Sequence, residues 1–199
     1  MRGEWSLLEI KHVLDEVVTL AQGMGGSTQF ISNTGGIEIS QGDTSNAAGL
    51  TSFHRIKFTN SPNSFSSWTV MHELAHAWDA NFGWKLSREL EEYTGGYTNK
   101  LFGTVKRAIG NCDPESMLPG CNNAGYYYSS IPGKGSDINF DRKEDFAESV
   151  TAYFHKEEAQ TWVNQYKNTI YEGLLYYSDY TQTLRWKFVD SLLNGEIAP

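Results

Sequence analysis

Positive charge and long apolar runs are both scarce in this sequence. Its 199 residues carry 16 Lys and Arg against 24 Asp and Glu, which gives a formal net charge of −8 at pH 7. Phosphate backbones and anionic headgroups repel a chain of this charge, so we expect neither nucleic acid nor a membrane surface as a partner. No apolar stretch approaches the length of a transmembrane helix, and the first five residues lack the apolar core of a signal peptide. Two alternatives follow: an intracellular chain, or a domain cut from a longer precursor.

Cysteine is also scarce. Cys112 and Cys121 are separated by eight residues in a segment rich in Gly, Pro and Asn. They lack the CxxC spacing and the four ligands of a structural zinc site. Two alternatives stay open for the pair: a disulfide that tethers the loop, as an oxidising compartment would allow, or two free thiols.

One motif with clear chemistry is present, an HExxH inside the apolar, helix-forming segment VMHELAHAWD at residues 70–79. Residues four apart lie on one face of a helix, so His72 and His76 can direct both imidazoles at one metal ion. Glu73 lies about 100° round the helix from His72, where it can reach a metal-bound water without ligating the metal. The alternative is a solvated face on an ordinary helix, since HExxH arises by chance in roughly one such chain in a hundred.

A second segment, DRKEDFAESV at residues 141–150, offers the ligand that HExxH lacks. Catalytic zinc usually takes three protein ligands and leaves a fourth position for water. Glu144 and Glu148 are four residues apart and share a helical face, which suits one ligand and one carboxylate that orients a ligating His. The alternative is a solvated acidic face at the start of a helix, with Asp141 and Glu144 as a capping pair.

Together, HELAHAWD and EDFAES resemble the gluzincin metallopeptidases, most closely the anthrax-lethal-factor group that includes the Pro-Pro endopeptidases. The detailed resemblance covers residues 66–84 and 141–155, with a weak echo at 184–189. It implies one Zn²⁺ per chain. By motif position the implied roles are zinc ligand for His72, His76 and Glu144, general base for Glu73, and outer-shell carboxylate for Glu148 and Asp79. Helical geometry agrees for Asp79, since seven residues from His72 is about 700°, within about 20° of the same face.

The sequence departs from this group at one position. Seven residues before the third ligand, the group carries a Tyr whose hydroxyl helps to stabilise the oxyanion, and this chain has Asp137. Tyr126, Tyr127 and Tyr128 are candidate oxyanion donors in its place. Packing or surface roles are the alternative for these three tyrosines.

Other zincin types fit less well. A metzincin needs Gly and His where Asp79 and Phe82 stand, and a peptide-deformylase-like site needs a Cys upstream of its HExxH. Of the remaining histidines, His12 and His54 are predicted to be structural, and His155 is predicted to be an ordinary exposed or half-buried residue. His12 belongs to the first helix and His54 to a strand, and His155 lies about 16 Å along its helix from the third ligand.

The order of elements predicts an α+β fold. Periodicity and turn residues predict a helix at 5–22 that ends in the segment 23–26, strands at 28–32, 37–40 and 53–59, helices at 86–93 and 100–109, a long irregular loop at 110–140, and further helices from 141 to 193. Ser64 or Ser66 is expected to cap the HExxH helix. The strand at 53–59 alternates apolar and polar residues, so we expect it to edge the cleft and to pair with extended substrate.

These observations predict a single zincin-like metallopeptidase domain over residues 1–199, with a small N-terminal mixed sheet, the HExxH helix and a mainly helical C-terminal part. The expected activity is that of a zinc-dependent endopeptidase acting on a peptide or protein substrate as a monomer. The alternative is a non-catalytic, zinc-containing binding or toxin-type module on the same scaffold. Lethal-factor-like peptidases are typically exported, so the resemblance also implies a secreted domain of a larger protein.

Overall fold

The computed structural model describes residues 3–45, 47–60, 65–93, 142–166, 170–171, 174–175, 181 and 184–197. Helices predominate in it, beside a three-stranded mixed sheet and a two-stranded ribbon, so the predicted α+β class is confirmed. The chain forms two compact units, Met1–Lys85 and Leu86–Pro199, which are described in turn. Within the described ranges, no helix combines the length and the apolar character needed to cross a membrane.

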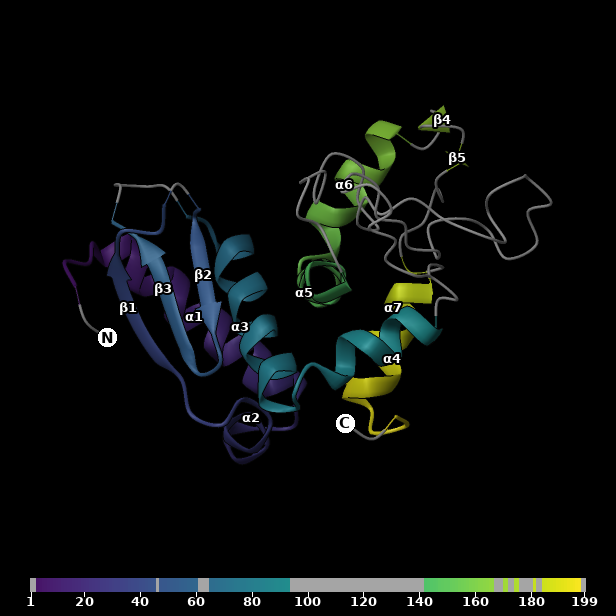
Figure 1. Ribbon diagram of the computed structural model, residues 1–199. Helices are drawn as coiled ribbons and strands as arrows, with labels where there is room; N and C mark the ends of the chain where they lie inside the picture. The colour runs from purple at the N-terminus through teal and green to yellow at the C-terminus, as the bar shows by residue number, and fades with distance from the viewer. Residues whose placement is uncertain are drawn as a thin grey trace, which may run out of the picture. The chain divides into compact units, whose positions relative to one another are not determined.

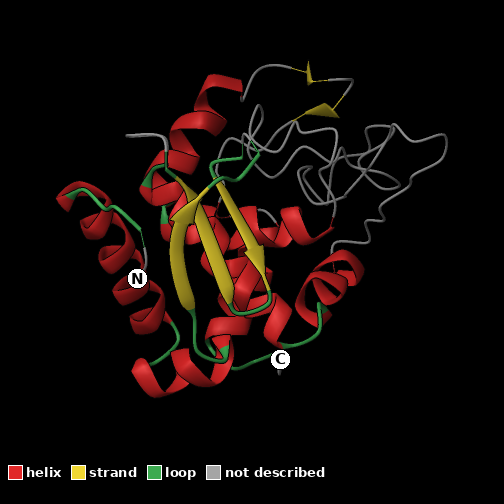
Figure 2. Ribbon diagram, turned by 60° about the vertical axis from the view of Figure 1, so that its left-hand side comes forward, coloured by secondary structure: helices red, strands yellow, loops and turns green. Residues whose placement is uncertain are grey.

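The first unit packs three helices with the three-stranded sheet (Figures 1 and 2). Its elements are α1 (Leu7–Gly23), α2 (Ser27–Thr34), β1 (Glu38–Gly42), β2 (Gly49–Ser52), β3 (Arg55–Thr59) and α3 (Ser67–Asn81). Helix α3 contacts both other helices and also strands β2 and β3. The helix that carries HExxH is therefore the centre of this unit.

The sheet has the order β1-β3-β2, with β1 parallel and β2 antiparallel to β3. In β3 the side chains alternate, since Ile56 and Phe58 are fully buried whereas Arg55 and Lys57 are exposed. One face of the sheet thus lies against the helices, as alternation requires of a half-buried strand. The predicted small N-terminal mixed sheet is confirmed.

Helix α1 (Leu7–Gly23) agrees with the helix predicted at 5–22 to within two residues at each end. Ser6 is the N-cap, and a capping box joins its backbone and side chain to Glu9. The helix ends at Gly23, and Gly25 and Gly26 follow with φ angles of 89° and 120° that favour glycine. Its inner face buries Val13 and Leu20.

The strand predicted at residues 28–32 is wrong, because Ser27–Thr34 forms α2. Its β-branched and aromatic residues have strand propensity, but tertiary contacts decide the outcome. Asn81 of α3 donates its side-chain N–H groups to the carbonyls of Ser32 and Asn33, at 3.1 and 3.0 Å. These bonds satisfy carbonyls that the end of a helix leaves without intrahelical partners, and Gly35 closes the helix with a φ of 73°.

The strand predicted at 53–59 exists as β3, yet its expected place at the edge is also wrong. β3 lies between the other two strands, and β1 and the unpredicted strand β2 form the two edges. Phe53 and His54 make a two-residue turn between β2 and β3, with Phe53 at a φ of 52°. The sequence carries no glycine at this turn, so the usual signal of a tight hairpin was missing.

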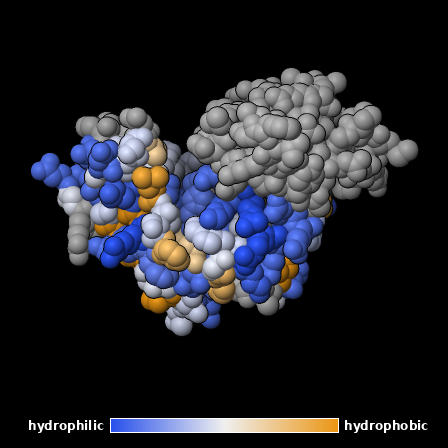
Figure 3. All heavy atoms as spheres, viewed as in Figure 1, coloured by the Kyte–Doolittle hydropathy of each residue, from blue (hydrophilic) through white to orange (hydrophobic). Residues whose placement is uncertain are grey.

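Figure 3 shows one face of the molecule, on which hydrophilic residues predominate over the coloured parts and hydrophobic residues gather in small groups. Exposed apolar side chains of the first unit include Leu7, Leu14 and Val18 on α1, and Leu50 and Phe53 at the edge of the sheet. Single exposed apolar residues of this kind are normal on soluble domains.

The second unit is mainly helical. Its elements are α4 (Lys85–Tyr93), α5 (Arg142–Phe154), α6 (Lys156–Tyr166), α7 (Leu184–Leu193) and the ribbon of β4 (Ile170–Tyr171) and β5 (Leu174–Leu175). The helix predicted at 86–93 is confirmed, and so are helices at Arg142–Phe154, Lys156–Tyr166 and Leu184–Leu193 within the predicted helical range, whereas the ribbon was not predicted. Helix α5 packs against α6 and α7. The core of this unit includes Phe146, Val150 and Phe188.

Several predictions lie outside the described residues. They concern the helix at 100–109, the loop at 110–140, Cys112 and Cys121, the three tyrosines Tyr126, Tyr127 and Tyr128, and Asp137, Asp141 and Ser64. The single zincin-like domain stays a prediction as well.

Candidate metal centre

The two histidines of HExxH stand on α3, a helix with apolar residues round most of its circumference. Such helices belong to protein interiors, and Trp68, Leu74 and Trp78 of α3 are all buried. Ser66 caps the helix by accepting a hydrogen bond from the backbone N–H of Thr69, as predicted for one of the two candidate serines. Because so many neighbours hold α3, the directions of its side chains are well defined.

His72 and His76 point their ring nitrogens at the same place. The two Nε2 atoms are 3.0 Å apart, and the rings lie edge to face at 84°. His76 is buried and His72 is half-buried. The predicted helical face with two convergent imidazoles is therefore present.

Glu73, the predicted general base, is held against strand β2. Its side chain is 5% exposed, and its Oε2 accepts a hydrogen bond from the Thr51 hydroxyl at 2.6 Å. The same hydroxyl lies 3.1 Å from the backbone carbonyl oxygen of Glu73. Gly49 passes so close that a Cβ there would lie 2.7 Å from Glu73 Oε1. The edge strand thus determines where this carboxylate can lie.

Asp79, predicted to be an outer-shell carboxylate, has no exposed surface. Its backbone carbonyl accepts hydrogen bonds from the N–H groups of Phe82 and Trp84, at 3.1 and 2.8 Å, where α3 ends. Asp79 has the helical position that the sequence predicted, on the face of His72, and its outer-shell role stays a prediction.

Glu144 and Glu148 belong to α5 in the second unit. Glu144 lies in the first turn and is half-buried, whereas Glu148 is 7% exposed one turn later. A metal ligand is expected to be more accessible than the outer-shell carboxylate that orients it, and Glu144 is more exposed than Glu148. Within α5, the exposure of these two side chains is compatible with Glu144 as the ligand and Glu148 as the outer-shell carboxylate.

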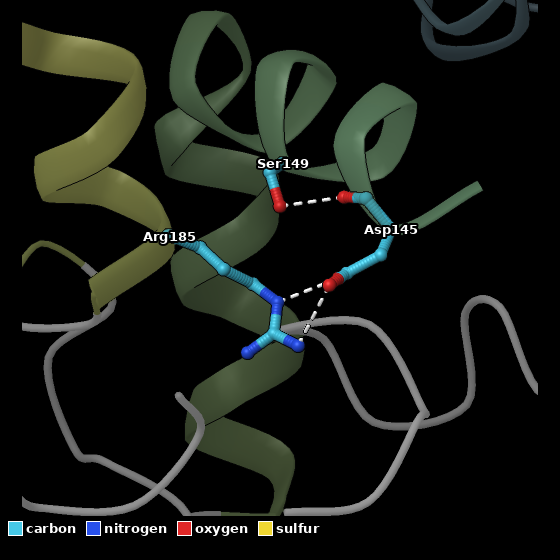
Figure 4. Close-up of polar contacts among 3 residues, drawn as sticks. All are labelled: Asp145, Ser149 and Arg185. Carbon is cyan, nitrogen blue, oxygen red and sulfur yellow. Dashed lines mark hydrogen bonds and ion pairs between the residues drawn. The ribbon is translucent and has the colours of Figure 1, made fainter. Parts of the chain in front are cut away.

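A buried ion pair fixes the start of α5 to α7 (Figure 4). Arg185 is fully buried, and its Nε and Nη2 donate to the two carboxylate oxygens of Asp145 at 2.6 and 2.9 Å. The Ser149 hydroxyl donates to the backbone carbonyl of Asp145 at 2.6 Å. Burial raises the pKa of Asp145, while the charge and hydrogen bonds of Arg185 oppose that rise. This pair orders the turn of α5 that carries Glu144.

His12 and His54 have structural surroundings, as predicted. His12 Nδ1 lies 2.9 Å from the Ser67 hydroxyl and so joins α1 to the start of α3. His54 Nδ1 lies 3.0 Å from the carbonyl of Thr34, although His54 stands in a turn and not in the predicted strand. His155 is half-buried between α5 and α6.

Sequence reasoning missed the residues that hold the candidate side chains in place. Thr51 and Gly49 stand in a four-residue strand with no strong periodicity, and their contact with Glu73 spans 22 residues or more of chain. Arg185 lies in the segment 184–189, where the resemblance to the lethal-factor group is weak, and the sequence predicted no role for its partner Asp145. Neither pairing leaves a local pattern in the sequence.

As a set of donors, His72, His76 and Glu144 could hold a metal ion. Two imidazole nitrogens and one carboxylate oxygen suit zinc as well as other divalent transition metals. In comparisons with known proteins, no family matched this sequence, and no curated protein or solved structure matched it either.

Proposed function

We propose that this protein is a zinc-dependent endopeptidase of the gluzincin type, with His72, His76 and Glu144 as metal ligands. The observation that carries the proposal is the convergence of the two Nε2 atoms of α3, 3.0 Å apart, next to a buried glutamate fixed by a neighbouring strand. The resemblance of the HExxH and EDFAES segments to the lethal-factor group supports the same assignment.

The histidines fit a zinc ion. Tetrahedral zinc with bonds of about 2.0–2.1 Å to nitrogen separates two such ligands by about 3.3 Å. The two Nε2 atoms are 3.0 Å apart, so movements of a few tenths of an ångström would bring both to zinc-binding distance. A carboxylate ligand from Glu144 would complete a set of three and leave one position for water.

A zinc ion held by these three side chains would lower the pKa of its bound water toward about 7 and would polarise the scissile carbonyl. Glu73 would accept the proton from the attacking water and return it to the departing amine as the C–N bond breaks. In this assignment its carboxylate contributes no bond to the metal, and the Thr51 hydroxyl holds it by a hydrogen bond of 2.6 Å. The buried His76 and Asp79 keep this side of the site shielded from solvent.

A second function, a non-catalytic zinc module, is favoured by one observation. Asp137 stands where the lethal-factor group carries its oxyanion tyrosine. Glu73 counts against this alternative, since a purely structural zinc site needs no base. A protein that holds one zinc per chain and cleaves no peptide in a diverse library would support it.

The decisive experiment compares the wild-type protein with Glu73→Gln on a diverse peptide library, with zinc content measured on both. Gln is nearly isosteric with Glu and cannot accept the proton, so the variant should keep its zinc and lose about 10²–10⁴-fold in activity. A chelator should abolish wild-type cleavage, and added zinc should restore it. Equal turnover by the two proteins at equal zinc occupancy would refute the proposal.

A further inference from the structure

Strand β2 holds the side chain of Glu73 through two residues on the same face of the strand. Thr51 donates a hydrogen bond to Glu73 Oε2 at 2.6 Å. Gly49, two residues earlier, leaves the space that the Glu73 Cγ and Oε1 occupy, because a Cβ at this glycine would lie 2.7 Å from each of them. We call Gly49 and Thr51 the β2 seat.

The β2 seat is itself held in register. Thr51 pairs with Ile56 of β3 and Gly49 pairs with Phe58, and both partners are completely buried. A threonine side chain is branched at Cβ and is therefore stiff at χ1. The hydroxyl thus has a fixed position before Glu73 makes any contact with it. A flexible glutamate side chain gains one preferred direction from this contact.

The geometry distinguishes the β2 seat from an ordinary hydrogen-bonded contact between a strand and a helix. The Thr51 hydroxyl has two acceptors within reach, the carboxylate at 2.6 Å and the Glu73 backbone carbonyl at 3.1 Å. It carries a single proton, and the carboxylate is both nearer and the stronger acceptor. An ordinary contact would need only the backbone carbonyl and would not need the glycine that accommodates the side chain.

We propose that Thr51, with Gly49, positions the carboxylate of Glu73 for proton transfer, and that β2 is in this sense part of the site. The inference rests on the proposed function, since it assigns to Glu73 the general-base role. Thr51 touches neither metal nor substrate in this assignment and acts only through Glu73. A base displaced by about 1 Å can lose about 100-fold in rate.

The test is a set of variants on the full chain. Thr51→Val keeps the shape and removes the hydroxyl, whereas Thr51→Ser keeps the hydroxyl. Thr51→Val should lower kcat by about 10- to 100-fold with KM and zinc content unchanged, and Thr51→Ser should remain within about threefold of the wild type. Ser52→Ala is the matched control, because it removes a hydroxyl from the same strand at an exposed position.

A double variant separates positioning from a merely structural role. In the Glu73→Gln background, Thr51→Val should cause little further loss, because the group through which it acts has already been neutralised. A structural role would lower the activity by the same factor in both backgrounds. Independent effects of the two substitutions would therefore overturn the inference, and so would wild-type kcat in Thr51→Val.

Failure of the proposed function has a different signature. It would appear as equal activity of Glu73→Gln and the wild type, or as no cleavage by the wild type at all. Crystal structures of the wild type and Thr51→Val, both incubated with zinc, test the β2 seat even then. We expect the Glu73 carboxylate in one orientation in the first and displaced in the second. An unchanged carboxylate in Thr51→Val would overturn the inference irrespective of activity.

Discussion

Helices α3 and α5 both carry candidate site residues, but they are held in place in different ways. Helix α3 lies among α1, α2 and two strands, and the convergence of His72 and His76 follows from the four-residue spacing of the helix itself. Helix α5 carries the half-buried Glu144 in its first turn and is held by packing against α6 and α7 together with one buried ion pair to α7. Local geometry thus accounts for the histidine pair, whereas long-range packing accounts for the carboxylate.

Among the variants that test this difference between α3 and α5, Glu144→Ala should have the largest effect on zinc content and activity. If α5 supplies the third ligand, the variant should lose stoichiometric zinc and all peptidase activity, although both histidines of α3 are intact. Elemental analysis of desalted protein measures the zinc content, and a peptide-cleavage assay measures the activity. Glu157→Ala, which removes an exposed carboxylate from the first turn of α6, is the control and should keep both. Full zinc content in Glu144→Ala would mean that α3 binds its metal with another ligand.

The same difference explains how far the sequence could predict the site. The HExxH spacing is a property of one helix, so the positions of His72, Glu73 and His76 on a single buried element were predicted correctly. The Ser66 cap and the extent of α1 were also predictable, because caps and periodicity are local. The role of Glu144 came instead from a resemblance, since no local rule connects residues about seventy apart.

Long-range packing also explains what went wrong in the fold. Residues 28–32 have strand propensity, but Asn81, about fifty residues later, satisfies carbonyls at the end of α2 and stabilises a helix. β2 was missed because four residues show too little alternation, and its pairing with β3 depends on a turn without glycine. The central strand β3 was consequently predicted to be an edge strand, and the contact between Thr51 of β2 and Glu73 was not predicted.

A second prediction tests the anchorage of α5 directly. Arg185→Met would leave the buried carboxylate of Asp145 without its partner, which should lower the free energy of unfolding by about 3–5 kcal/mol. Denaturant unfolding of the metal-free protein measures the loss. Lys187→Met, at an exposed position of the same helix, is the matched control.

The double variant Asp145→Leu/Arg185→Met sharpens this test. Replacing both partners by apolar residues removes the stranded charge, so much of the lost stability should return. If Arg185→Met alone stayed within about 1 kcal/mol of the wild type, the ion pair would not anchor α5, and packing of its apolar face would have to do so.

A third prediction distinguishes the two carboxylates of α5. Glu148→Ala should weaken zinc binding by about 10- to 100-fold without abolishing it, as is usual for groups that orient a ligand. Competition with a chromophoric chelator measures the zinc affinity. Glu148→Gln keeps an acceptor oxygen, so its zinc affinity should lie between those of Glu148→Ala and the wild type. Complete loss of metal in Glu148→Ala, with metal retained in Glu144→Ala, would reverse the two roles.

The smallest effect is expected at the start of α1, where a purely local device stabilises the unit that carries α3. The pKa of Glu9 is lowered, chiefly by the hydrogen bond from the Ser6 backbone N–H, against an opposing effect of burial. A lowered pKa in the folded state means that the ionised form stabilises the fold. This contribution is complete above the ordinary value of 4.5 and is lost as the pH falls through the lower, folded-state pKa.

Glu9→Gln keeps an acceptor for the capping box but never carries the charge. At pH 7 it should cost about 0.5–1 kcal/mol of unfolding free energy, because the negative charge at the start of the helix is lost. The difference from the wild type should shrink on acidification, since both side chains are then neutral. Urea unfolding at pH 7, 5, 4 and 3 measures it, with the exposed Glu4→Gln as control. A difference that stayed constant or grew at low pH would show that Glu9 acts by packing rather than by charge, and the start of α1 would then depend on tertiary contacts as α5 does.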